Sequence, residues 1–100
     1  MIEIHRLNTL NNEIIMEMSE NGKTICQAKA ISHTDGTAEI ISLGNGYDMG
    51  KALLNAIDLM GIKDVFCKDL TLKNVLTALK FKDAGDRFIL NLEGYFTGGC

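Results

Sequence analysis

The residues best suited to chemistry lie between positions 42 and 61, where an alternating segment gives way to one with helical periodicity. The junction contains Gly44, Gly46 and Gly50, and Lys51 follows directly. A strand, a glycine-rich loop and a helix N-terminus, in that order, can form a concavity of backbone amides that binds a phosphate. The first interpretation is therefore an anion site built from the amides of residues 46–51.

Asp48 gives the same loop a second interpretation, as the N-cap of the helix. Its carboxylate would accept hydrogen bonds from the amides that a phosphate would need, and it would gain about 0.3–1 kcal/mol from the helix dipole. It would also repel a dianion at close range. These magnitudes favour the capping interpretation and leave the anion site as a testable alternative.

Glu39 is the candidate general base. It lies on an alternating segment, where a carboxylate can deprotonate an acceptor amine directly or through water. The alternation places it on one face with Thr37, Ile41 and Leu43, which indicates that this face is partly covered. An ordinary solvent-facing glutamate is the alternative.

Cys67 ends a short apolar segment and would act as a nucleophile only beside a base such as His33 or His5. A buried structural cysteine is the favoured alternative. Neither histidine has a second ligand at metal spacing, so we expect no metal site, and His33 is interpreted as a solvated turn residue. With Cys26 and Cys100 the cysteines number three, without a C-x-x-C spacing, which favours a reducing cytoplasm over a disulfide framework.

The composition is that of a folded domain. With 100 residues, 46% hydrophobic and 23% charged, the chain predicts one domain over residues 1–96 and a frayed tail at 97–100. The net charge of −3 and the scattered lysines and arginines predict no nucleic-acid partner and no anionic membrane surface. The opening M-I-E-I-H-R-L is interrupted by charge and is not expected to be a signal peptide.

The first half of the chain predicts an antiparallel meander. Apolar residues alternate with polar ones in segments that hairpin signals separate, above all Asn21-Gly22 and Asp35-Gly36. The expected strands cover residues 2–7, 13–20, 23–33 and 37–43, and the polar residues 8–12 connect the first two.

The second half predicts alternating helices and strands. Apolar residues at spacings of three and four indicate a helix from Met49 to Met60, with Gly61 as its C-terminal cap. A strand follows at 65–67, then a second helix over 72–79 that starts at Asp69 or Thr71 as N-cap. Residues 81–85 and 88–92 form a short extended piece and a last strand. The fold class is a mixed sheet, α+β or α/β, in which an antiparallel meander precedes β-α-β-α-β.

Four segments in this order resemble the GNAT superfamily of N-acyltransferases: A-E-I-I-S-L at 38–43, G-K-A-L-L at 50–54, M-G-I-K-D-V-F at 60–66 and L-K-F-K-D-A-G at 79–85. The resemblance covers residues 13–93. It implies that acetyl-CoA or another acyl-CoA is bound, with pyrophosphate at residues 45–51 and pantetheine along Ile41 and Leu43. The implied cofactor-binding residues are Ile41, Leu43, Asn45, Gly46, Tyr47, Asp48, Met49, Gly50 and Lys51, with Glu39 as the candidate base.

The sequence departs from the family pattern in several places. Asn45 stands where glutamine or arginine is usual, Asp48 replaces the first glycine of the motif, and the loop is several residues shorter. Leu76 occupies the place of a tyrosine that protonates the leaving thiolate in many members. Only residues 8–12 separate the first two strands, so the two N-terminal helices that wall the acceptor pocket are lacking.

Two functions follow from this resemblance. The first is a minimal acyl-CoA-dependent N-acetyltransferase acting on a small-molecule or protein amine. The second is a non-catalytic GNAT-like module for oligomerisation or protein binding. In either case the missing helices would expose an apolar face, which predicts a homodimer.

Overall fold

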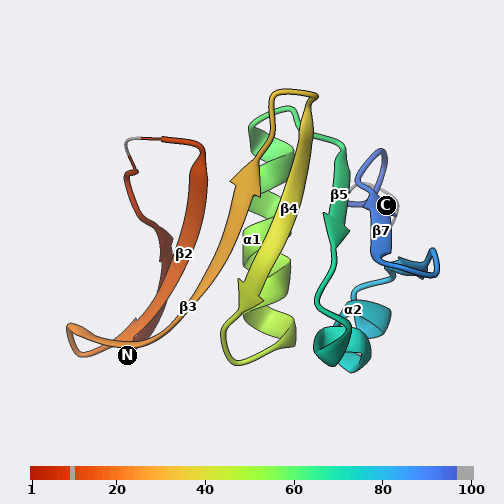
Figure 1. The fold of residues 1–100 in the computed structure, drawn as a ribbon. Coiled ribbons are helices and arrows are strands. Elements are labelled where there is room, and N and C mark those ends of the chain that lie inside the picture. Colours follow the sequence, from red (N-terminus) through yellow and green to blue (C-terminus); the bar gives the residue numbers. More distant parts are fainter. Residues whose placement is uncertain (10, 97–100) are drawn as a thin grey trace.

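A computed structural model describes residues 1–9 and 11–96, and its strands form one seven-stranded sheet in the order β1-β2-β3-β4-β5-β7-β6 (Figure 1). The tail predicted at 97–100 lies outside the described residues. The strands are β1 (Ile2–Arg6), β2 (Glu13–Glu20), β3 (Lys23–Ser32), β4 (Thr37–Leu43), β5 (Asp64–Cys67), β6 (Lys82–Asp83) and β7 (Phe88–Asn91). The helices are α1 (Tyr47–Leu59), a 3-10 turn η1 (Leu70–Leu72) and α2 (Lys73–Ala78).

The predicted antiparallel meander is confirmed, because β1 to β4 pair in sequence order with antiparallel neighbours. Asn21 and Gly22 have φ of 52° and 82°, the two positive values that a type I′ turn requires. At the next turn the Asp35 carboxylate accepts hydrogen bonds from the Thr37 amide (3.1 Å) and hydroxyl (2.7 Å). Local turn chemistry thus sets the register of both hairpins.

The helix α1 crosses from β4 to the parallel strand β5 and packs on one face of the sheet, behind the strands in Figure 1. Its apolar side chains meet small residues of the sheet, and both sets are buried. They include Leu53, Leu54 and Ile57 of α1 against Ala28, Ala30 and Ala38. The alanines let the helix approach the sheet closely, which is how this short chain forms a packed core.

The end of α1 follows its prediction. Gly61 has φ of 84°, its amide donates to the Asp58 carbonyl (2.9 Å), and the Ile62 amide donates to the Ile57 carbonyl (3.4 Å). These two bonds make a Schellman motif. The second helix is shorter than predicted: Asp69 accepts from the Thr71 amide and caps η1, and α2 follows only from Lys73. No helix in residues 1–9 and 11–96 is long and apolar enough to cross a membrane.

The alternation of β4 is broken at Ile41. Ile40 pairs with Ala30 and Ser42 with Lys29, so Ile41 is an extra residue, a β-bulge. As a result Leu43 lies in the core, 3% exposed, whereas Ile41 is 40% exposed. The prediction that Leu43 shares a face with Glu39 is therefore wrong, because alternation alone does not anticipate a bulge.

Candidate functional site

The strands β4 and β5 are paired over only part of their length. Their register joins Thr37 to Asp64, Ala38 to Val65 and Glu39 to Phe66, and there it ends. Beyond this point β4 continues to Leu43, and the two strands diverge toward their C-terminal ends (Figure 1). The last paired residue on β4 is the predicted base, Glu39.

The start of α1 differs from its prediction. Gly46 is the N-cap residue, with φ of 114° and ψ of −128°, and Asp48 lies inside the first turn. The interpretation of Asp48 as the N-cap is therefore wrong. The reason is the turn before the helix: the Gly46 amide donates to the Leu43 carbonyl (3.1 Å), and only glycine adopts this φ readily, so the helix begins two residues early.

This start leaves backbone donors at the helix terminus. The first intrahelical bond runs from the Gly50 amide to the Gly46 carbonyl (2.9 Å), so the amides of Tyr47, Asp48 and Met49 precede it. Among the described residues no side chain caps these three amides. The predicted anion site thus keeps its backbone donors, although the Asp48 carboxylate lies beside them.

The side chains of the loop have other partners. The Lys51 ammonium lies 4.7 Å from the ring centroid of Tyr95 and 5.5 Å from that of Phe96, with Tyr47 at 6.0 Å. The Asn45 side-chain amide donates to the Met18 sulfur (3.6 Å). Lys51 therefore makes cation–π contacts, and its charge is directed toward aromatic rings.

Gly50 and the apolar residues around it serve packing. A Cβ atom at Gly50 would lie 2.7 Å from Leu79 Cδ1 and 3.5 Å from Leu43 Cδ2. Leu43 and Met49 are 3% and 0% exposed. Of the two residues expected along pantetheine, only Ile41 therefore reaches the surface.

Glu39 lies on the sheet face opposite α1, here called the open face. Its Oε1 atom is 3.0 Å from Nε2 of His33, and the His33 ring stacks on Phe66 with centroids 5.8 Å apart and planes 20° apart. His33 is thus more than a solvated turn residue. The hairpin at Asp35-Gly36 could have indicated this pair, because residues 33 and 39 fall on the same face of its two strands.

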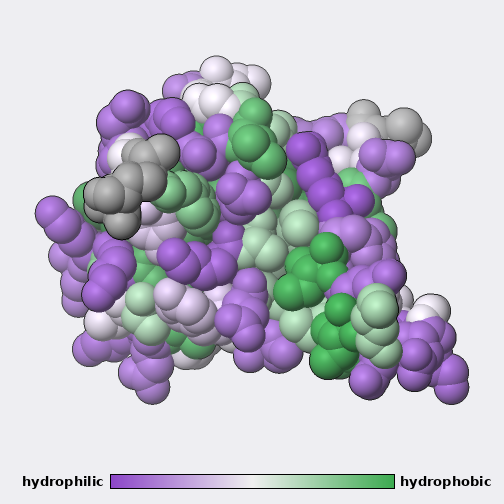
Figure 2. Space-filling model, turned by 180° about the vertical axis from the view of Figure 1, so that it is seen from behind, coloured by the Kyte–Doolittle hydropathy of each residue, from purple (hydrophilic) through white to green (hydrophobic). Residues whose placement is uncertain are grey.

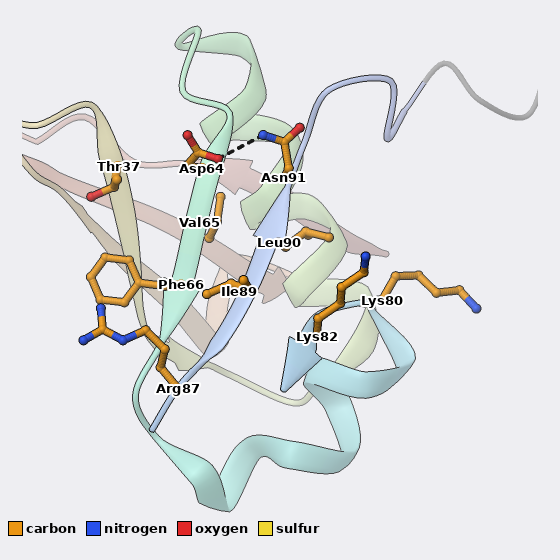
Figure 3. Close-up of a pocket in the computed structure, with 10 residues that line it drawn as sticks. All are labelled: Thr37, Asp64, Val65, Phe66, Lys80, Lys82, Arg87, Ile89, Leu90 and Asn91. Atoms are coloured by element: carbon orange, nitrogen blue, oxygen red, sulfur yellow. Dashed lines mark hydrogen bonds between the residues drawn. The ribbon is translucent and has the colours of Figure 1, made fainter. Parts of the chain in front are cut away.

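The open face also holds a cavity of about 460 Å³ between β4, β5 and the β6–β7 hairpin (Figure 3). Its walls are apolar at Phe66 and Ile89 and cationic at Lys82 and Arg87. A neighbouring hollow of about 390 Å³ shares Phe66 and Arg87 with it and is also lined by Glu39. Sequence reasoning missed this cavity, because its residues come from strands that only the tertiary fold brings together.

Cys67 does not join this site. Adjacent residues of a strand point to opposite faces of the sheet, so Cys67 points into the core, whereas Phe66 stacks against His33 on the open face. Burial raises the pKa of the Cys67 thiol, which disfavours the thiolate that a nucleophile needs. Within residues 1–9 and 11–96, no group of three or more potential ligand side chains is placed to hold a metal ion.

Comparison with solved structures supports the fold. No protein-family model matches the chain, and no curated protein matches its sequence. An IAA acetyltransferase from Bacillus cereus ATCC 14579 superposes with a TM-score of 0.61 at 12% identity, over 82% of this chain and 77% of that one. A domain from Methanocaldococcus jannaschii DSM 2661 superposes with a TM-score of 0.59 at 14% identity, over 82% and 67%. The chain therefore has a GNAT-like fold.

Proposed function

We propose that this GNAT-like domain transfers an acyl group from acyl-CoA to an amine. The observation that carries the proposal is the position of Glu39, which is hydrogen-bonded to His33 at the point where β4 and β5 begin to diverge. A carboxylate at this point can act as a base toward a molecule on the open face. Acyl-CoA would approach the same point from the start of α1.

The start of α1 fits the pyrophosphate of such a molecule through its backbone. The amides of Tyr47, Asp48 and Met49 would donate to it, and the positive end of the helix dipole favours an anion there. The Asp48 carboxylate opposes this, and Lys51 is engaged with aromatic rings. We therefore expect weak binding that rests on backbone donors.

When bound, acyl-CoA supplies an activated thioester carbon, which an amine can attack. Glu39 would accept the proton of the amine, and His33 would hold the carboxylate in place and relay the proton to solvent. Leu76 is fully buried where many family members have a tyrosine, so it donates no proton, and water would protonate the leaving thiolate. The acceptor would be a small-molecule or protein amine.

Calorimetric titration with acetyl-CoA tests this function on the native chain and on Asp48→Asn and Asp48→Gly. Removing the carboxylate should raise the affinity about twofold to tenfold, because it removes repulsion at the helix start. Glu20→Gln, a remote loss of the same charge, should leave the affinity unchanged. Absence of binding by all four proteins would exclude acyl-CoA as a substrate.

A second candidate is a non-catalytic GNAT-like module that binds another protein. Two observations favour it: the leucine at the tyrosine position, and the engagement of Lys51 with Tyr95 and Phe96. Binding of acetyl-CoA that emerges only in the Asp48 variants would support this candidate, since the native site would then be degenerate.

We also propose that the chain forms a homodimer through β1. This strand lies at one end of the sheet, and Ile2 and Ile4 on it are 57% and 40% exposed. Figure 2 shows a hydrophobic patch on this side of the molecule, at the lower right. Antiparallel pairing with β1 of a second copy would continue the sheet and cover the patch.

A reducing cytoplasm is the setting proposed, consistent with free thiols at Cys26 and Cys67.

A further inference from the structure

We infer that the amine acceptor carries a carboxylate, which binds Arg87 in the open-face cavity. The acyl transfer to this molecule rests on the proposed function. Its binding rests on the cavity alone. The inference therefore names the class of substrate: an amine and a carboxylate joined by a short apolar segment.

The charges of the cavity favour one carboxylate. Lys80, Lys82 and Arg87 line it with one acid, Asp64, whose carboxylate accepts a hydrogen bond from the Asn91 side chain (2.9 Å). Figure 3 shows Arg87 beside Phe66, whereas Lys82 lies on the other side of β7 and points away from both, and Lys80 points away from the cavity. Arg87 is therefore the cation placed to hold an anion beside Phe66.

A neighbouring carboxylate, that of Asp86, competes with a bound anion for Arg87. The Asp86 carboxylate lies 3.5 Å from the Arg87 Nε atom, but its side chain is 77% exposed and the pair is weak. The guanidinium keeps its other donors, whose planar arrangement matches a carboxylate. With Asp64 and Asp86 nearby, a singly charged carboxylate suits the site better than a phosphate dianion.

The cavity continues toward Glu39 across one aromatic ring. The Arg87 Cζ atom lies 5.0 Å from the Phe66 centroid, and the His33 ring lies 5.8 Å from the same centroid. Glu39 follows at 3.0 Å from His33, and Ile89 widens the apolar floor. A molecule with its carboxylate at Arg87 and its apolar segment on Phe66 would thus present its amine to the carboxylate that attracts and deprotonates it.

Amide NMR titrations without CoA test the binding, with 5-aminopentanoate, pentanoate and pentylamine as matched probes. We expect 5-aminopentanoate to shift the amides of Phe66, Ile89 and Asn91, and to bind more tightly than either single-ended probe. Arg87→Gln should weaken it about threefold to tenfold, because this variant loses a charge-assisted hydrogen bond. Lys23→Gln, at the distant start of β3, should not. The amide spectra show whether each variant is folded.

The outcomes separate this inference from the proposed function. Equal affinities of 5-aminopentanoate and pentylamine, or an unchanged affinity in folded Arg87→Gln, would overturn the inference. Acetyl transfer to pentylamine at the same rate as to 5-aminopentanoate would also overturn it while leaving the acyltransferase intact. Binding of 5-aminopentanoate that is weakened in Arg87→Gln, without any acetyl transfer, would support the binding site and count against the proposed function.

Discussion

His33 and Glu39 meet across the β3–β4 hairpin, with Nε2 of the imidazole 3.0 Å from Oε1 of the carboxylate. Both side chains are partly exposed, 39% and 20%, and the imidazole rests on Phe66 of the neighbouring strand. The ring therefore holds the carboxylate beside the last pair of the β4–β5 register. A base in this position is oriented and yet accessible to a substrate.

The variants Glu39→Gln and His33→Gln test this arrangement in acetyl transfer from acetyl-CoA to 5-aminopentanoate. Glu39→Gln should lower kcat about 100-fold or more, the usual contribution of a positioned general base. The loss in His33→Gln should be smaller, because the glutamate remains. The affinity for acetyl-CoA should not change in either variant.

A second His–Glu pair supplies the control. His5 and Glu17 lie 3.3 Å apart on β1 and β2, away from the β4–β5 divergence. Glu17→Gln should keep full activity. If Glu39→Gln is as active as Glu17→Gln, Glu39 is not the base.

The elements of the fold could be predicted from the sequence because their signals are local. Asn21-Gly22 and Asp35-Gly36 specify tight turns, and the spacing from Met49 to Met60 specifies a helix. Gly61 ends that helix with the geometry its position predicts. Each of these signals acts within a few residues.

The candidate site could be predicted only in part, because its geometry depends on tertiary structure. The sequence predicts Glu39 as the candidate base, but its contact with His33 depends on the hairpin register, and the place of Arg87 depends on the arrangement of β5 and β7. The predicted N-cap at Asp48 is wrong because the φ of Gly46 starts the helix before Asp48. Propensity ranks residues for a cap but does not fix the turn that leads into it.

Gly50→Ala should destabilise the fold by about 1 kcal/mol. The added Cβ would lie 2.7 Å from Cδ1 of Leu79, which is fully buried, and overpacking of this kind costs about 1–3 kcal/mol. The gain in helix propensity, about 1 kcal/mol, offsets only part of this. Urea unfolding measures the difference, and the pair Asn55→Gly and Asn55→Ala on the exposed side of α1 reports the glycine-to-alanine propensity gain alone.

The same substitution in a Leu79→Val background isolates the contact. Valine shortens the side chain that the new Cβ would meet, so Gly50→Ala should become neutral or stabilising there. An equal loss in both backgrounds would show that Leu79 is not the cause.

Asp35 should make the stability of the β3–β4 hairpin depend on pH in acid. The hydrogen bond from the Thr37 hydroxyl, followed by that from the Thr37 amide, lowers the pKa of Asp35 in the folded state. The stabilisation is therefore fully present above the unfolded pKa of about 4 and is lost as the pH falls through the folded value. Thr37→Val removes the hydroxyl, which is the larger cause. The variant should therefore have a lower free energy of unfolding than the native chain at pH 6, and this difference should shrink as the pH falls to about pH 2.5. Thr77→Val, exposed on α2, should show a difference that does not vary with pH.

The homodimer proposed through β1 predicts that two exposed isoleucines respond differently to a charge. Ile4 lies on the edge strand β1, whose backbone would pair with the second copy, so Ile4→Lys should give a monomer, because a lysine on an edge strand blocks pairing. Ile41 is equally exposed, 40%, but lies on the β4 bulge, and Ile41→Lys should leave the dimer intact. Sedimentation equilibrium at micromolar to high micromolar concentrations measures both. A native chain that stays monomeric throughout would refute the dimer, whereas dissociation by Ile41→Lys alone would move the interface to the open face of the sheet.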